Sequence, residues 1–406
     1  MGKPYKIKRH KHIYRRSFGS IVMRICIIVA AIAVLFCLGW GLYGPVSDWL
    51  EQRKNGPVEE TTIGSSQQTD EGEATESEPE EEQTPVVEEP VQEATASMTA
   101  YLPTATVLDN QLLTAAIADA KAAGYDSIMF DLKTDDGTVI YPIAYNESTD
   151  AAVTSTTTID LTAVVTQIKD AGLTPVASIH TFRDHLYPSA NKAAATLYMD
   201  SDFLWVDDDP NNGGKAWLNP FSTEAQSYIQ KIVDDACNAG FEMIILQDVQ
   251  FPEGYSLDMI DYGDHASDDK NLFLQQYAAQ MADYAAAKGV ELSCMLPASS
   301  MLGGNTAMYF GDTTAMAGES AAIDLRMSVF GSGLQTDQVS IPDPSANPYN
   351  TIKTASAAIK QKLPDCQLIA VLDGTGLSAE EVSNRVLGAQ ESGIERYIIV
   401  DPSLGQ

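Results

Sequence analysis

The 406-residue sequence predicts a (β/α)8 barrel over residues 97–406, preceded by one transmembrane helix and a disordered acidic stalk. Two observations predict the barrel. Short apolar runs typical of buried parallel strands alternate with Ala-rich helical segments. Several of these helical segments also end at a glycine just before the next apolar run, which is a helix C-cap signal. These glycines are Gly124, Gly172, Gly240, Gly289 and Gly393.

The amino-terminal residues predict a membrane anchor. Residues 1–24 carry eight Lys and Arg and no acidic residue, and residues 25–43 carry no charge. An apolar run of this length can just cross a bilayer, and a basic flank favours a cytoplasmic amino terminus. We therefore expect a basic cytoplasmic segment at 1–24, a signal-anchor at 25–43 and an extracellular location for everything that follows. A cleaved signal peptide is the alternative, since 31–33 resembles a cleavage site, but this triplet lies inside the apolar run.

Residues 44–96 are predicted to be a disordered acidic linker. No Lys or Arg occurs between residues 55 and 120, and residues 76–93 are rich in Glu, Pro, Gln and Thr. Such a segment buries too little apolar surface to offset the entropy cost of ordering. We expect it to hold the globular part away from the membrane.

The barrel requires eight strands and the helices between them. The predicted strands are 98–102, 127–133, 174–181, 242–249, 290–296, 322–330, 367–373 and 396–401. The predicted helices are 110–123, 160–171, 223–239, 271–288, 349–362 and 378–392. A long excursion at 184–220 precedes the fourth strand and is expected to lie over the carboxyl face as a lid or groove wall.

Polar residues gather where the predicted strands end, which is where barrel proteins build their sites. Residues 240–252 show this most clearly, because a buried run ends in Gln247, Asp248 and Gln250. Strand alternation predicts that Gln247 points into the barrel. Other strands end in, or are followed by, Asp131, Lys133, Ser178, His180, Arg183, Asp324, Arg326, Asp373 and Asp401.

Four motifs together resemble the "putative glycoside hydrolase" domain family of membrane-anchored bacterial proteins, a barrel related to the α-amylase clan. The motifs are FDLKTDDG at 130–137, SIHTFRD at 178–184, KAWLNP at 215–220 and QDVQFP at 247–252. The resemblance covers most of residues 97–406. It implies a TIM barrel that acts on polysaccharide.

The sequence departs from this family at the positions that matter for catalysis. Where the family has F-D-Y-V-R-F-P, this chain places Gln247 at the presumed nucleophile and Gln250 at the Arg. Met295 stands where the family has a second carboxylate, and Ser178 and Arg326 also differ from the usual residues. Glycosidases normally need two carboxyl groups, so we expect weak or absent turnover together with oligosaccharide binding.

Three functions remain open: a glycoside hydrolase acting on a cell-surface polysaccharide, a catalytically silent glycan-binding barrel, and a structural protein of the cell envelope. The candidate catalytic carboxyls are Asp248, Asp131, Asp324 and Asp373. The candidate substrate-binding residues are Lys133, His180, Arg183, Trp217, Asn219, Gln247, Gln250 and Arg326, with Trp217 and Tyr187 as stacking surfaces.

Partners follow from charge and composition. Residues 55–406 carry 15 Lys and Arg against 54 Asp and Glu, which would repel nucleic acid. Polysaccharide or oligosaccharide and the membrane are the expected partners, and protein partners are not predicted. Neither a metal nor another cofactor is expected, because the five cysteines are scattered and the Asp-rich loop 207–213 lacks calcium-loop spacing.

Overall fold

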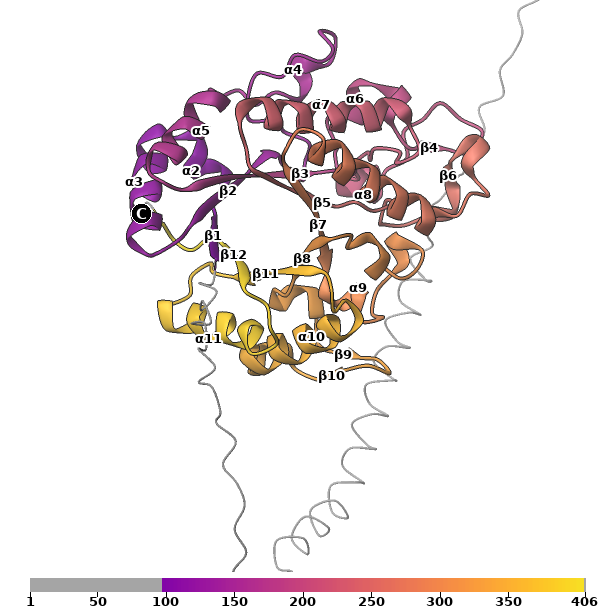
Figure 1. Ribbon diagram of the computed structural model, residues 1–406. Helices are drawn as coiled ribbons and strands as arrows, with labels where there is room; N and C mark the ends of the chain where they lie inside the picture. Colours follow the sequence, from indigo (N-terminus) through magenta and orange to yellow (C-terminus); the bar gives the residue numbers. More distant parts are fainter. Residues whose placement is uncertain (1–96, 405–406) are drawn as a thin grey trace, which may run out of the picture. The chain divides into compact units, whose positions relative to one another are not determined.

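The computed structural model describes residues 97–404, and the predicted segments 1–24, 25–43 and 44–96 lie outside these residues. The predicted barrel is confirmed: eight parallel strands close into one sheet (Figure 1). In order around the barrel they are β1 (Ser97–Tyr101), β12 (Arg396–Val400), β11 (Gln367–Asp373), β8 (Ser320–Asp324), β7 (Glu291–Pro297), β5 (Met243–Gln247), β3 (Thr174–His180) and β2 (Ser127–Lys133). Within residues 97–404, no helix has the length and apolar character to span a membrane.

Helices surround this sheet and connect its strands. The longer ones are α3 (Asn110–Ala122), α5 (Leu161–Asp170), α7 (Thr223–Ala239), α8 (Lys270–Ala286), α10 (Pro348–Lys362) and α11 (Ala379–Gln390). Short helices are α2 (Thr104–Leu108), α4 (Asp150–Val153), α6 (Tyr187–Ala190) and α9 (Ala298–Met301). Local signals set their ends: in α7, the Ser222 side chain accepts the Ala225 N–H, and Gly240 follows the last turn with φ of 93°.

The strand predicted at 322–330 differs most from the observed strand, β8. The expected strand 322–330 ends at Asp324, and Met327–Phe330 forms a 3-10 helix, η7. Asp324 Oδ1 accepts the Arg326 backbone N–H at 3.1 Å, which turns the chain away from the sheet. A local side-chain bond of this kind competes with the strand ladder.

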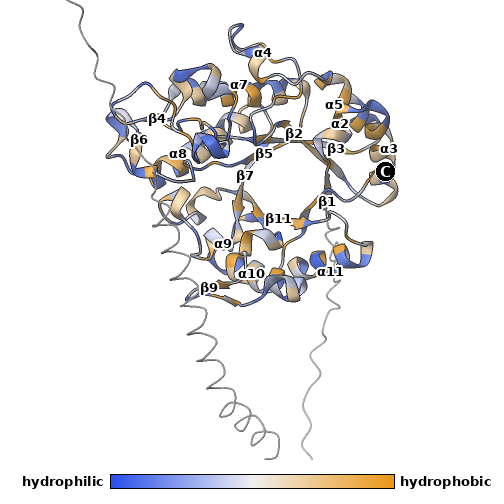
Figure 2. Cartoon of the chain, turned by 180° about the vertical axis from the view of Figure 1, so that it is seen from behind, coloured by the Kyte–Doolittle hydropathy of each residue, from blue (hydrophilic) through white to orange (hydrophobic). Residues whose placement is uncertain are grey.

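The core has two parts. Alternate strand residues point inward and fill the barrel with apolar side chains, while the opposite strand faces pack against the helices. The inward group is Met129, Val176, Met243, Ile245, Met295, Ala322, Ile369, Val371 and Ile398. Figure 2 shows the corresponding apolar stretches along the barrel strands.

Two connections on the carboxyl side pair with each other. The β3–α7 connection contains β4 (Leu197–Tyr198) and the β5–α8 connection contains β6 (Ile260–Asp261), and these short strands are antiparallel. Trp205, Trp217 and Ile260 form a small core beneath them. We call residues 184–220 and 252–269 the flanking lobe.

The flanking lobe corrects the expectation of a lid. Its strands lie at the side of the barrel, next to α8 (Figures 1 and 2). None of residues 184–220 lines the pocket at the carboxyl ends of the strands. The excursion is long because it builds a second small core, which single-sequence periodicity does not reveal.

Candidate functional site

A pocket of about 460 Å³ opens at the carboxyl ends of the barrel strands. Its lining includes Tyr101, Asp131, Asp135, His180, Arg183, Gln247, Asp248, Arg326 and Asp401. Two of these residues follow strand ends in a left-handed conformation, Asp248 with φ of 50° and Asp401 with φ of 46°. Such backbone costs free energy for a residue with a side chain and is found preferentially at functional sites.

Asp131 lies on β2 and accepts hydrogen bonds from two hydroxyl groups. Tyr101 donates to its Oδ1 at 2.5 Å, and Ser178 donates to the same oxygen at 2.6 Å. Gln247 Nε2 in turn donates to Tyr101 at 2.8 Å and to Ser178 at 2.7 Å. Burial raises the pKa of Asp131, and the opposing effects of His180 and the two hydroxyls do not cancel this.

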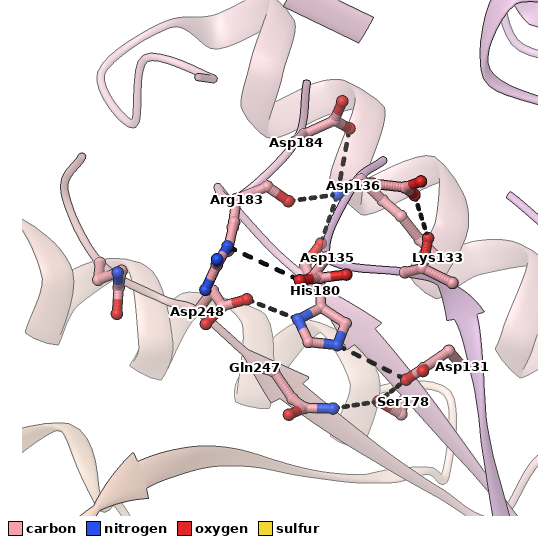
Figure 3. A network of polar contacts seen from close by, with 12 residues as sticks. Asp131, Lys133, Asp135, Asp136, Ser178, His180, Arg183, Asp184, Gln247 and Asp248 are labelled. Carbon is pink, nitrogen blue, oxygen red and sulfur yellow. Dashed lines mark hydrogen bonds and ion pairs between the residues drawn. The ribbon is translucent and has the colours of Figure 1, made fainter. Parts of the chain in front are cut away.

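His180 ends β3 and lies between two carboxyl groups (Figure 3). Its Nδ1 is 2.5 Å from Asp248 Oδ2, and its Nε2 is 3.8 Å from Asp131 Oδ1. Burial lowers the pKa of His180, but the hydrogen bond and charge of Asp248 outweigh it, so the pKa is raised. Burial likewise raises the pKa of Asp248, but His180 outweighs it and the pKa is lowered. Both shifts favour the charged forms, an imidazolium beside a carboxylate.

Lys133 does not reach the pocket, which corrects its expected role in substrate binding. Its side chain is fully buried and lies 3.1 Å from Asp184 Oδ2. It also donates to the carbonyl oxygens of His180 at 2.7 Å and Arg183 at 3.1 Å. Lys133 therefore fixes the backbone that carries the two pocket residues.

The two arginines of the pocket are held differently. Arg183 lies 3.9 Å from Asp135 and 3.8 Å from Glu253, beyond hydrogen-bond distance from both. Arg326 instead binds both carboxylate oxygens of Asp324, through Nε at 2.9 Å and Nη2 at 2.6 Å. Arg183 thus has N–H donors left for a ligand, whereas two N–H donors of Arg326 are already used by Asp324.

Asp324 and Asp373 have structural partners. The Asp324 carboxylate is occupied by Arg326, and Asp373 Oδ2 accepts the Met327 backbone N–H at 2.9 Å. Neither aspartate lines the pocket. Of the four candidate catalytic carboxyls, Asp131 and Asp248 are therefore the two that line the pocket.

Three other predicted binding residues lie away from the pocket. Trp217 is fully buried and its Nε1 donates to Asp207 at 3.0 Å, so its ring has no face for a sugar. Asn219 accepts the Phe221 N–H at 3.1 Å, and Gln250 is buried and accepts from Tyr309 at 3.3 Å. The expected stacking role of Trp217 is therefore corrected to a packing role.

Tyr187 is also corrected as a stacking surface. It is fully buried and stacks on Tyr228 with ring centroids 3.9 Å apart. Conversely, sequence analysis missed Tyr101, which lines the pocket from β1. Its place near the end of the first strand was the available signal. Side chains two positions apart on a strand point to the same face, so Tyr101 faces inward together with Thr99.

A second cavity, of about 200 Å³, lies at the amino ends of the strands. Ser97, Thr174 and Arg396, all first residues of strands, line it. Arg396 binds both carboxylate oxygens of Glu291 at 2.8 and 3.1 Å. This end of a barrel generally serves stability, and the ion pair fits that role.

The fold and the site define a TIM barrel with a carboxyl-lined pocket at the carboxyl ends of its strands. Residues 99–404 match the family model described as "putative glycosyl hydrolase domain", so the chain belongs to this family. A comparison with curated proteins gives no match.

Several solved structures resemble this chain in fold at low sequence identity. The catalytic domain of β-amylase from Paenibacillus polymyxa has 11% identity and a TM-score of 0.48, with 75% of this chain and 92% of that chain covered. α-Galactosidase from Thermus thermophilus has 11% identity and a TM-score of 0.46, with coverage of 76% and 58%. A hypothetical protein from Ruminiclostridium thermocellum has 21% identity and a TM-score of 0.41, with coverage of 48% and 96%. At these TM-scores the likenesses add nothing to the family assignment.

Proposed function

We propose that this protein is a membrane-anchored extracellular domain that binds cell-surface polysaccharide in the carboxyl-end pocket without hydrolysing it. One observation carries the proposal: the His180 imidazole lies between Asp131 and Asp248, 3.8 Å from one carboxyl and 2.5 Å from the other. The basic flank and apolar run at 1–43 support the anchor.

Glycosidases place their two carboxyl groups on opposite sides of the scissile bond. The separation is about 5–5.5 Å in retaining enzymes and about 6.5–9.5 Å in inverting enzymes, with the space left to sugar or water. Here an imidazole takes that space and forms an ion pair with Asp248. A sugar linkage between these carboxyls would have to displace a charged, hydrogen-bonded ring.

Gln247, the last residue of β5, also argues against turnover. Gln247 points into the barrel and donates to Tyr101 and Ser178. An amide forms no glycosyl ester and holds no labile proton. Of the two candidate catalytic carboxyls in the pocket, Asp248 is paired with His180 at 2.5 Å, and Asp131 has no ion pair within hydrogen-bond distance.

Binding needs only hydrogen-bonding groups in a concave site. The pocket volume of about 460 Å³ falls within the usual range of about 300–1,000 Å³ for ligand sites. Arg183 offers unused N–H donors, and Asp135 and Asp401 line the same pocket. With Trp217 buried, we expect hydrogen bonds rather than aromatic stacking to supply most of the affinity.

Hydrolysis is the second candidate, and a specific observation favours it. The pKa of Asp131 is raised while that of Asp248 is lowered, which is the division expected for a general acid and its partner base. This function requires His180 to leave its position when substrate binds.

The binding proposal is tested with the full-length protein in detergent micelles and an array of cell-wall oligosaccharides. Arg183→Gln should weaken binding about tenfold or more, since a charged hydrogen-bond donor is lost. Arg385→Gln serves as the matched control, because Arg385 lies on α11 and does not line the pocket. Equal binding by wild type and Arg183→Gln would place the ligand elsewhere.

A further inference from the structure

Gln247 and Asp131 are joined through two hydroxyl groups that converge on one oxygen. Gln247 Nε2 lies 2.8 Å from the Tyr101 hydroxyl and 2.7 Å from Ser178 Oγ. Both hydroxyls lie against Asp131 Oδ1, at 2.5 and 2.6 Å (Figure 3 shows the Ser178 branch). Four residues from β1, β2, β3 and β5 thus form one closed network.

The direction of each hydrogen bond follows from the number of protons available. A hydroxyl has one proton, so a hydroxyl that accepts from Gln247 is free to donate to Asp131. With the amide reversed, both hydroxyls would donate to Gln247, and Oδ1 would face two oxygens with no proton between them. Only the orientation with Nε2 toward the hydroxyls lets both hydroxyls donate to Asp131.

We propose that Gln247 is a positioning residue for Asp131: it turns the Tyr101 and Ser178 hydroxyls onto Oδ1, which leaves Oδ2 to meet the ligand and to carry the proton when Asp131 is neutral. This rests on the proposed function only for the nature of the ligand, a sugar. The network itself exists without one.

The arrangement makes the pocket sensitive to pH through one oxygen atom. A neutral Asp131 donates a hydrogen bond from Oδ2 to a sugar oxygen, whereas an ionised Asp131 accepts one from a sugar hydroxyl. The groups that act on its proton affinity are Tyr101 on β1, Ser178 and His180 on β3, and Asp135 beyond β2. Asp248 is bonded to His180 and acts on Asp131 through it.

A carboxyl at position 247 would be incompatible with this role. Each hydroxyl can donate only once, so Asp131 and a glutamate would compete for two protons at close range. Like charges that share a site retain one proton between them and titrate in two coupled steps. The amide avoids this competition because it supplies donors and carries no charge.

The test follows the Asp131 carboxyl by carbon-13 NMR in the full-length protein labelled at aspartate Cγ, with Asp131→Asn used to assign the signal. In Gln247→Met the hydroxyls lose the donors that orient and polarise them. The titration midpoint of Asp131 should then move up by about half a pH unit or more. In Gln247→Glu it should move up by about one unit or more and show two steps. Gln250→Met, which removes another buried amide outside the pocket, should leave it in place.

An Asp131 midpoint in Gln247→Met equal to that of wild type would overturn the proposal, as would an equal shift in Gln250→Met. If Gln247→Met does not fold, Gln247→Glu decides: a single step at the wild-type midpoint refutes the shared network. No sugar is present in these measurements. Their outcome is therefore separate from whether the pocket binds carbohydrate.

Discussion

His180 Nδ1 lies 2.5 Å from Asp248 Oδ2, so a residue at the end of β3 is paired with the residue that follows β5. The two strands are adjacent, with His180 in register with Gln247. The pair is possible because the left-handed backbone at Asp248, with φ of 50°, brings its carboxylate to the same pocket as Gln247. In a regular strand two consecutive side chains would point to opposite faces.

The first prediction concerns the pH dependence of this pair. The pKa of His180 is raised in the folded state, so its stabilising effect is complete below the unfolded value, about 6.5, and is lost as pH rises through the folded pKa. The pKa of Asp248 is lowered, so its effect is present above the unfolded value, about 3.9, and is lost as pH falls. Both effects are present between about pH 4 and 6.5.

Asp248→Asn should therefore lower the free energy of unfolding by about 1–3 kcal/mol near pH 5.5 and by much less at alkaline pH. The measurement is thermal unfolding of wild type and variant across pH. Asp258→Asn, an exposed aspartate in the flanking lobe, is the control. A loss in Asp248→Asn that does not change with pH would show that His180 is neutral in the native state.

The second prediction concerns the buried pair of Lys133 and Asp184. Lys133→Met leaves a buried, unpaired carboxylate, so we expect it to lower the free energy of unfolding by about 3–5 kcal/mol. Lys133→Met combined with Asp184→Asn should cost less, because the uncompensated charge is gone. Denaturant unfolding measures both. A double variant that is less stable than Lys133→Met alone would show that Asp184 acts mainly through its bonds to the Leu186 and Tyr187 N–H groups.

The third prediction compares two glycines. Gly137 has φ of 98°, and a Cβ there would lie 2.2 Å from Asp184 Oδ1, whereas Gly124 has φ of 83° and open space. Gly124→Ala should lower the free energy of unfolding by about 1 kcal/mol, from backbone strain alone. Gly137→Ala should cost about 2–4 kcal/mol, because it also displaces the buried ion pair. Equal losses in chemical denaturation would mean that the turn at Gly137 shifts freely.

The fold was largely predictable because its signals are local. The ranges predicted for 127–133 and 367–373 coincide with β2 and β11, since each contains a run of apolar residues, at 128–130 and 368–372, next to polar residues. The long helices were predicted equally well because N-caps such as Ser222 and glycines such as Gly240 mark their ends. Burial of both strand faces in a parallel barrel makes such runs easy to locate.

The site was only partly predictable because its details depend on long-range contacts. Sequence reasoning placed Asp131, His180, Gln247 and Asp248 at strand ends, but not the link that His180 makes between two of them. The burial of Trp217 depends on pairing between β4 and β6, about 60 residues apart, and no local pattern encodes that pairing. Lys133 is buried for the same kind of reason, since its partner Asp184 lies in another connection.

The fourth prediction concerns the amino-terminal anchor. Protease added to intact cells should release a soluble fragment that begins within residues 44–96, because the basic flank and apolar run at 1–43 predict an external barrel. Immunoblotting against the barrel detects the fragment, and a cytoplasmic protein monitors cell integrity. Protection of the barrel in intact cells, with cleavage only after lysis, would reverse the proposed topology.

Binding without hydrolysis is tested most directly by a long incubation of the full-length protein with purified cell-wall polysaccharide, in which bound protein and newly formed reducing ends are measured together. We predict that the protein is retained by the polysaccharide, that Arg183→Gln weakens this retention, and that no reducing ends form above those in a protein-free control. Reducing ends that accumulate with wild type and disappear with both Asp131→Asn and Asp248→Asn would contradict this prediction. In that case the two carboxyls on either side of His180 would be the catalytic pair.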